Sequence, residues 1–119
     1  MSITHTANLV TEAVTEAGSP SQTGAELVAL TNLCKASADK LRLLVLRVLR
    51  TDSFGVSELC SIFDIRQPAL SHHLKVLANA GLVAARREAN SIFYRRSELG
   101  QDTHLAALQN SLFDTIDGL

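Results

Sequence analysis

The sequence predicts a mainly α-helical fold with one small β-hairpin, and two observations carry that prediction. Apolar residues recur every three or four positions over most of residues 25–81 and again over residues 102–116, as in amphipathic helices. Between these stretches, residues 82–87 and 91–96 are short runs of β-compatible residues around a turn. A helix that begins with proline and presents a polar face, followed directly by a hairpin rich in arginine, is typical of a winged helix-turn-helix.

The chain is predicted to divide into a mobile N-terminal arm, residues 1–23, and one winged helix-turn-helix domain, residues 24–119. Threonine and serine are scattered among short apolar pieces of the arm, and Gly18-Ser-Pro-Ser21 breaks any helix, although a brief helix over residues 7–17 fits the pattern. A chain of 119 residues with 46% hydrophobic residues is long enough for one compact domain. Its core would be modest, which is compatible with a homodimer.

Two helices are expected before the helix-turn-helix. The first covers residues 25–35, with apolar residues at helical spacing: Leu27, Leu30, Leu33 and Cys34. Ser37 and Asp39 can then start a second helix over residues 38–50. That helix has apolar residues on more than one side, so it is predicted to be the central core helix. Its main face comprises Leu41, Leu44, Val45, Val48 and Leu49, and Leu43 and Leu46 widen it.

The next two helices form the predicted helix-turn-helix. Ser57-Glu58 opens a short helix, and residues 64–66 form the turn. Pro68 suits the first position of the following helix, where its missing N–H costs nothing, and Gly81 ends that helix. Its buried anchors are predicted to be Leu70, Leu74 and Leu77. The outward side chains are small or form hydrogen bonds, and can approach base edges and phosphates: Gln67, Ala69, Ser71, His72, Lys75 and Asn79.

The hairpin after Gly81 is the predicted wing. Its strands cover residues 82–87 and 91–96, and Asn90 in the turn between them is expected to take the positive φ. A last helix over residues 102–116 repeats apolar residues at Leu105, Leu108, Leu112 and Ile116. This apolar stripe needs a partner.

The charges separate along the chain. All 11 Lys and Arg residues fall between Lys35 and Arg96, where five acidic residues leave a net charge of +6, while the two flanks hold seven acidic residues and no basic one. A basic centre between acidic ends fits a nucleic-acid-binding face, although a folded surface can also mix such charges without binding anything.

Several other classes of protein are not expected. The N-terminus lacks the pattern of a signal peptide, and the most apolar stretch, residues 41–49, is short and interrupted by two arginines, so a cytoplasmic protein is predicted. Cys34 and Cys60 both lie in helical patterns, which suits reduced, buried thiols better than a disulfide framework. No Ser-His-acid set, glycine-rich phosphate loop or Cys-His constellation occurs, so the chain is not expected to be an enzyme.

Residues 33–97 resemble the ArsR/SmtB family of bacterial winged-helix repressors, many of which respond to metals or redox signals. The resemblance is carried by four segments: Ala38-Asp-Lys-Leu-Arg-Leu43, Arg66-Gln-Pro-Ala-Leu-Ser-His-His-Leu-Lys-Val-Leu77, Ala80-Gly-Leu-Val83, and Arg86-Arg87 with Tyr94-Arg95. It implies the element order α-α-α-α-β-β-α and a homodimer in which the first and last helices pair across a two-fold axis. The partner is then double-stranded DNA with an imperfect inverted repeat, whose half-sites lie about one helical turn apart.

On this basis, Gln67, Ser71 and His72 are predicted to contact bases in the major groove, and Lys75 a phosphate. Candidates for wing contacts with the backbone or minor groove are Arg86, Arg87 and Arg95; the alternative for each is a solvated strand end. Arg66 stands where the family commonly has a capping serine, which adds a candidate phosphate contact while weakening the cap. His73 points about 100° away from His72 on the helix, so a half-buried, hydrogen-bonded role is expected for it.

The family's effector-binding sites match this sequence less well than its DNA-binding segments do. The family's arsenic-type cysteine pair falls on Gly55 and Ser57, so that thiolate site is absent. For a zinc-type site, or one for another divalent metal, Asp102 and His104 match the first half. The second half of that site falls on residues 115 and 118, and the nearby carboxylates of Asp114 and Asp117 are each displaced from it by one residue. Asp102, His104, Asp114 and Asp117 would therefore come together only if the helix were re-registered.

Two alternatives stand beside a metal site. In the favoured one, Asp102 caps the last helix and His104 lies on its surface. In the other, Cys34 and Cys60 form a thiol switch, although neither occupies the family's usual redox position.

The predicted function is that of a dimeric, sequence-specific DNA-binding transcriptional regulator, a repressor released by an effector. The alternative is a winged-helix module for protein interaction, with the acidic flanks and the last helix as its working surface. Such a module would have no reason to place Lys75 and three wing arginines beside a Ser-His edge.

Overall fold

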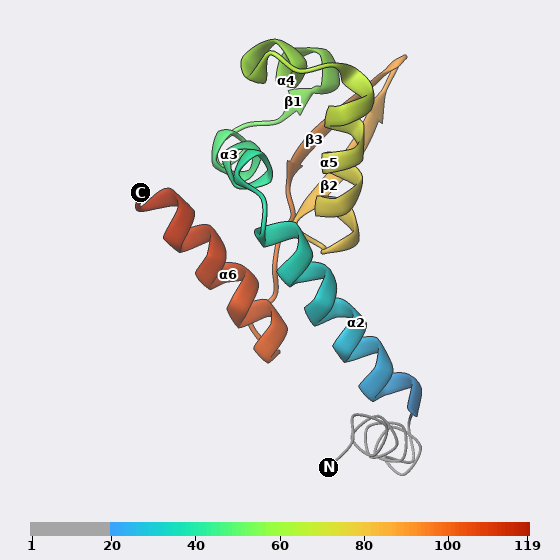
Figure 1. Cartoon of the computed structure of the whole chain (residues 1–119), viewed down its shortest axis with the longest axis vertical. Coiled ribbons are helices and arrows are strands. Elements are labelled where there is room, and N and C mark those ends of the chain that lie inside the picture. Colours follow the sequence, from blue (N-terminus) through green and yellow to red (C-terminus); the bar gives the residue numbers. More distant parts are fainter. Residues whose placement is uncertain (1–19) are drawn as a thin grey trace, which may run out of the picture.

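The computed structural model describes residues 20–119 (Figure 1). The elements follow in the order α2 (Pro20–Ser37), α3 (Lys40–Val48), β1 (Phe54–Gly55), α4 (Val56–Phe63), α5 (Gln67–Asn79), β2 (Val83–Glu88), β3 (Ser91–Arg96) and α6 (His104–Asp117). The mainly helical winged helix-turn-helix with a terminal helix is therefore confirmed. The helix considered for residues 7–17 lies outside the described residues.

Helix α2 begins earlier than predicted. Its first residue is Pro20, so residues 20–23, which the sequence placed in the arm, are helical. Proline fits the first turn because it donates no N–H there. The N-terminal half of α2 extends away from the rest of the molecule (Figure 1), and its apolar side chains Leu27, Val28 and Leu30 are exposed. None of the helices within residues 20–119, α2 included, is long and apolar enough to cross a membrane.

The sheet has three strands rather than the two that were predicted. Strand β1, with Phe54 opposite Tyr94 and Gly55 opposite Phe93, pairs antiparallel with β3, and the order is β1-β3-β2. Residues 51–55 were expected to be a plain link. A strand of two residues has no alternating pattern, so only its pairing with β3 identifies it.

The core lies where α3, α4 and α5 meet the base of the wing. Leu70, Leu74 and Leu77 are fully buried, as predicted, together with Val45, Leu46, Leu49, Leu59 and Leu82. Helix α3 is the central core helix, but two of its residues differ from expectation. Leu44, assigned to the buried face, is 38% exposed, while Arg42 is only 9% exposed.

The two turns around the wing give one confirmed and one wrong prediction. Gly81 has φ 73° and ends α5, and the Leu82 N–H donates to the Leu77 carbonyl at 3.0 Å, which satisfies a terminal carbonyl of the helix. In the wing, Ala89 rather than Asn90 has the positive φ, at 55°. Because β2 continues to Glu88, the loop has two residues, and its first position takes the left-handed conformation.

The cysteines do not share one environment. Cys60 is half-buried and packs against the core, but Cys34 is exposed, contrary to the expected buried thiol. Cys34 lies on the outer side of α2, whereas its neighbours Leu33 and Ala36 on the same helix are buried. Both thiols are free.

Candidate nucleic-acid interface

The helix-turn-helix is formed by α4, a three-residue turn and α5. Asp64 ends α4 in the left-handed conformation, with φ 52°, and the Ile65 N–H donates to the Cys60 carbonyl at 3.1 Å. Aspartate tolerates this conformation better than most residues because its short polar side chain can bond locally. The sharp turn lets α5 start immediately in a new direction.

The start of α5 has no side-chain cap. Arg66 is the N-cap residue, and its side chain makes no capping hydrogen bond, as predicted for an arginine in place of serine. The Arg66 side chain is exposed, and Pro68 occupies the first turn. A cation therefore stands at the helix end that enters first if α5 approaches DNA.

Helix α5 has two distinct faces. Its leucines point into the core, whereas Gln67, Ser71, His72 and Lys75 are all exposed. Gln67, Ser71 and Lys75 follow one another at intervals of four residues, so they form one stripe, with His72 beside it. The helix thus presents hydrogen-bonding groups and a positive charge along a continuous outer edge.

His73 is half-buried and hydrogen-bonded, as expected. Its Nδ1 lies 3.1 Å from Nη1 of Arg42. A guanidinium only donates, so Nδ1 accepts and the ring proton lies on Nε2. His73 therefore attaches the middle of α5 to α3.

Arg42, which the sequence did not single out, joins three helices. Its guanidinium donates to the carbonyls of Lys35 at 2.8 Å and Ala36 at 3.1 Å, at the end of α2, as well as to His73 on α5. Its backbone N–H donates to the N-cap Asp39, and this hydrogen bond, with the nearby guanidinium charge, holds the pKa of Asp39 below its ordinary value. The only sequence signal for this role was that Arg42 is one of the charged residues in the predicted core helix.

The wing arginines are divided between two faces of the hairpin. Arg86 lies opposite Phe93 and Ala84 opposite Arg95, so Arg86 and Arg95 share one face, while Arg87 points to the other. All three are exposed. Arg86 donates to Glu88 at 2.9 Å, whereas Arg87 has no acidic partner among residues 20–119.

The tip of the wing and the start of α5 belong to one region. A cavity of about 430 Å³ is lined by residues 55–58, Gln67 and residues 90–93. Figure 1 shows the wing tip and the first turn of α5 at the same end of the molecule. The start of α5 and the tip of the wing therefore lie close together on one side of the domain.

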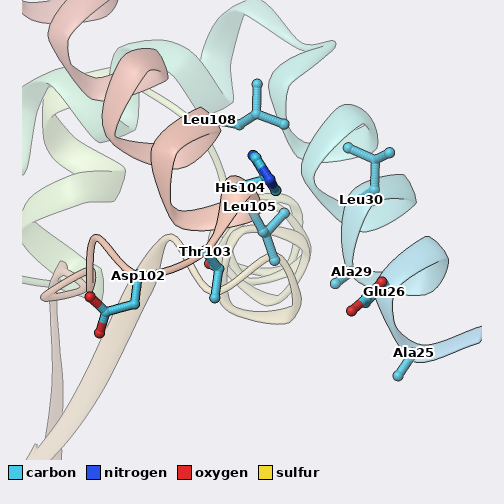
Figure 2. A pocket seen from close by; sticks show the side chains of 9 residues that line it. All are labelled: Ala25, Glu26, Ala29, Leu30, Asp102, Thr103, His104, Leu105 and Leu108. Carbon is cyan, nitrogen blue, oxygen red and sulfur yellow. The ribbon is translucent and has the colours of Figure 1, made fainter. Parts of the chain in front are cut away.

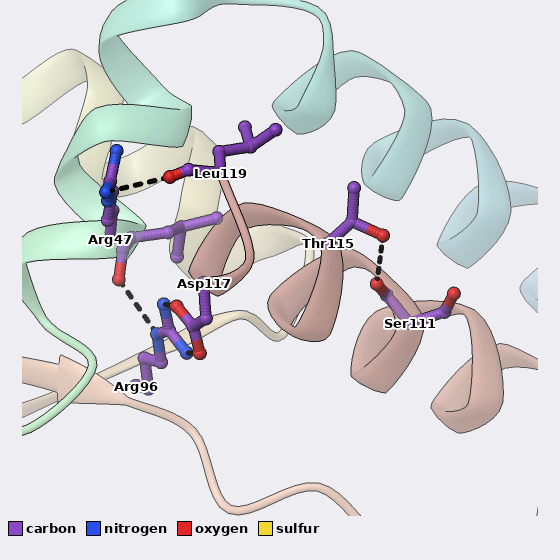
Figure 3. A network of polar contacts seen from close by, with 7 residues as sticks. Arg47, Arg96, Ser111, Thr115, Asp117 and Leu119 are labelled. Carbon is purple, nitrogen blue, oxygen red and sulfur yellow. Dashed lines mark hydrogen bonds and ion pairs between the residues drawn. The ribbon is translucent and has the colours of Figure 1, made fainter.

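The base of the wing is fastened to α6. Both terminal nitrogens of Arg96 donate to the Asp117 carboxylate, at 2.6 and 2.8 Å, and its Nε donates to the Leu46 carbonyl at 2.8 Å (Figure 3). The guanidinium also lies 4.5 Å from the centre of the Phe113 ring. The Arg96 hydrogen bonds, helped by its charge, hold the pKa of Asp117 below its ordinary value.

The four candidate metal ligands are not brought together within one chain. Asp117 is engaged with Arg96, and ten residues of helix separate His104 from Asp114, which is about 15 Å. Figure 2 shows Asp102 on the loop before α6 with its carboxylate directed away from His104. Within residues 20–119, no group of three or more His, Cys, Asp or Glu residues is placed to hold a metal ion.

The start of α6 corrects one prediction. Its N-cap is Thr103, whose hydroxyl accepts from the Ala106 N–H at 3.0 Å, and not Asp102. His104 is exposed on the surface of α6, as predicted. It lines a cavity of about 650 Å³ between α2 and α6 with an apolar floor that includes Leu30 and Leu108 (Figure 2).

Known proteins share this sequence pattern. The family model described as bacterial regulatory protein, arsR family, matches residues 39–85. The biofilm growth-associated repressor of Agrobacterium fabrum is 48% identical over 66 residues, 56% of this chain and 56% of the relative. The transcriptional activator HlyU of Vibrio cholerae is 43% identical over 65 residues, 55% of this chain and 60% of the relative. In sequence, this chain therefore spans less than two thirds of either relative.

Solved structures share the fold over more of the chain. The structure of HlyU from Vibrio cholerae superposes with a TM-score of 0.59 at 34% identity, covering 76% of this chain and 94% of that one. The homodimeric winged helix-turn-helix DNA-binding domain Mb0332 from Mycobacterium bovis, a possible ArsR-family regulator, superposes with a TM-score of 0.64 at 29% identity, covering 79% and 83%.

Proposed function

Because this chain belongs to the arsR family of bacterial regulatory proteins, we propose that it is a dimeric, sequence-specific DNA-binding transcriptional regulator that acts as a repressor. The observation that carries this proposal is the exposed stripe of Gln67, Ser71 and Lys75 on α5, beside a wing with three exposed arginines. Hydrogen-bonding side chains such as Gln67 and Ser71 can distinguish base edges, whereas arginines bind the phosphates of DNA of any sequence. Arg66, at the N-cap of α5, adds a second phosphate-binding candidate.

The two kinds of contact predict different mutant behaviour. Ser71→Ala or His72→Ala is expected to weaken binding to the preferred sequence by about 1–3 kcal/mol per half-site and to relax base preference. Arg87→Ala is expected to weaken binding to every sequence similarly and to lower the slope of log affinity against log salt by about one per copy. The measurement is titration of each protein with a duplex selected by the wild type from a random pool, and with a scrambled duplex, over a series of salt concentrations.

Glu88 provides a control on the same wing, because Glu88→Gln removes a negative charge and should strengthen binding to both duplexes. Equal losses on both duplexes from Ser71→Ala and Arg87→Ala would contradict base reading by α5. If the wild type enriches no duplex from the random pool, the result would favour the alternative, a protein-interaction module.

We further propose that α2 and α6 form the dimer interface. Leu27, Val28 and Leu30 on α2 and Leu108 on α6 are exposed apolar side chains, and the homodimeric Mycobacterium bovis domain has the same fold. Covering these side chains with a second copy would remove apolar surface from water. Two copies related by a two-fold axis would present two α5 helices to an inverted repeat.

Leu108→Asp is expected to weaken dimerisation at least about ten-fold, because a carboxylate would be buried in an apolar interface. Sedimentation velocity over a range of protein concentrations measures the change. Ile62→Asp is the matched control, since Ile62 on α4 is 47% exposed and Leu108 is 50% exposed. An equal effect of both substitutions would place the interface elsewhere.

If the protein binds zinc or another divalent metal through its four candidate metal ligands, the ion would have to lie between two copies of the chain. The ends of α6 that carry His104 and Asp114 are too far apart within one chain to share an ion. Recruiting Asp117 would also require breaking its ion pair with Arg96. In a single copy, a thiol-reactive effector would reach Cys34 before Cys60, because Cys34 is exposed and Cys60 is half-buried.

A further inference from the structure

The C-terminal end of α5 receives hydrogen bonds from both helices of the proposed dimer interface. Gln109 on α6 donates its side-chain amide to the Ala80 carbonyl at 2.9 Å, in a buried position. Asn32 on α2 donates its amide to the neighbouring Asn79 carbonyl at 3.4 Å. The last carbonyls of a helix have no partner within the helix, so these amides satisfy groups that would otherwise need water.

Gln109 is not an ordinary core residue. It is 7% exposed, and only it and Arg42 are buried polar or charged residues in the part of the chain that the structure describes. Its amide also lies close to the backbone of Gly81, because a Cβ atom at that position would be 3.3 Å from Nε2 of Gln109. Glycine at position 81 therefore serves both the left-handed backbone and the approach of this amide.

Two directional contacts define the axis of α5. Arg42 holds the middle of the helix through His73, and Gln109 holds its end through Ala80, with the longer, exposed Asn32–Asn79 hydrogen bond beside it. The contacts of the buried leucines are not directional, so they define the tilt of the helix less sharply than hydrogen bonds do. A single fixed point would let the helix pivot, whereas two fix its direction.

A small tilt of α5 would be costly for base reading. Without the Gln109 contact, α5 would pivot around His73, and Gln67 lies six residues before His73, which is about 9 Å along the helix. A tilt of about 10° around His73 would move Gln67 by about 1.6 Å, still more than the tolerance of a hydrogen bond. Phosphate contacts from long, flexible arginines are less sensitive to such a shift.

Resting on the proposed DNA-binding function, we infer that Gln109 is a positioning residue for base reading. It ties the direction of the recognition helix to α6, the helix through which the two copies pair.

The test replaces Gln109 by leucine, which keeps the approximate size but removes the donor. The matched control is Asn110→Leu, because Asn110 is the next residue on α6 and donates the same kind of amide to Gly100, outside α5. Affinities are measured for the duplex selected by the wild type and for the scrambled duplex. Sedimentation velocity and circular dichroism check assembly and folding.

We expect Gln109→Leu to lower affinity for the selected duplex about ten-fold, with affinity for the scrambled duplex and dimerisation within two-fold of the wild type. Asn110→Leu should change neither affinity. If Gln109→Leu does not fold, Gln109→Met, with its flexible unbranched chain, is measured instead.

A folded dimeric variant with an unchanged ratio of selected to scrambled affinity would overturn the positioning role. Equal losses on both duplexes would do the same, since a tilt should spare phosphate contacts. If instead the wild type does not discriminate between the duplexes, the proposed function itself fails, and the two failures are thereby distinguished.

Discussion

Arg42→Met is expected to lower the free energy of unfolding by about 3 kcal/mol. Methionine can fill the space of the arginine stem, but it leaves the carbonyls of Lys35 and Ala36 without their donor. His73 Nδ1 would lose its partner, and Asp39 its nearby positive charge. Each buried polar group left unsatisfied costs about 1–3 kcal/mol, partly recovered where water can enter.

Urea unfolding followed by circular dichroism measures the effect, and Arg47→Met is the control. Arg47 lies on the same helix, but it is exposed and its only side-chain hydrogen bond among residues 20–119 is to the Leu119 carbonyl, at 3.2 Å (Figure 3). Its replacement should cost less than about 1 kcal/mol. Similar losses for both variants would show that the contacts of Arg42 with α2 and α5 add little.

Arg96→Met is expected to lower the free energy of unfolding by about 3 kcal/mol at neutral pH. It should also change how the free energy of unfolding depends on pH under acidic conditions. The substitution removes the paired hydrogen bonds to Asp117, the bond to the Leu46 carbonyl and the contact with the Phe113 ring. Such charge-assisted pairs are stronger than neutral hydrogen bonds. The wing would then lose its main polar attachment to α3 and α6.

The pH dependence follows from Asp117. Its pKa is lowered in the folded protein by Arg96, so this contribution to stability is complete above the unfolded pKa of about 4 and is lost as the pH falls through the lower folded pKa. The difference in unfolding free energy between wild type and Arg96→Met should therefore be constant above about pH 5 and narrow below about pH 4. Asp39 is retained in both proteins and cancels in the difference.

Arg95→Met is the control for that experiment, because Arg95 is the adjacent residue, is exposed and has no acidic partner among residues 20–119. It should change stability by less than about 0.5 kcal/mol at every pH. A difference between wild type and Arg96→Met that stays constant down to pH 3 would contradict a stabilising Arg96–Asp117 pair.

Sequence reasoning succeeded where one element contains all the information. Leu70, Leu74 and Leu77 are buried because their spacing places them on one side of a helix, and the same spacing leaves Ser71 and Lys75 outside. Gly81 ends α5 because glycine readily adopts a positive φ. These features depend on short segments of chain.

The errors occurred where the local signal was ambiguous. Helix α3 has apolar residues on several sides, so periodicity could not show that Leu44 faces outward. Asp102 and Thr103 are both good capping residues, and the path of the chain from β3 into α6 selects Thr103. At the wing, the length of β2 determines that Ala89 takes the positive φ.

By itself, the sequence determined the helical core, the arginine wing and the exposed polar edge of α5, because spacing within each element decides which side chains are buried. Only the tertiary structure decided the partners of the long polar side chains. Arg42 reaches His73, Arg96 reaches Asp117 and Gln109 reaches Ala80, across separations of 21 to 31 residues. A hydrogen bond depends on distance and direction between two groups, and those are set only when separate helices and strands have packed together.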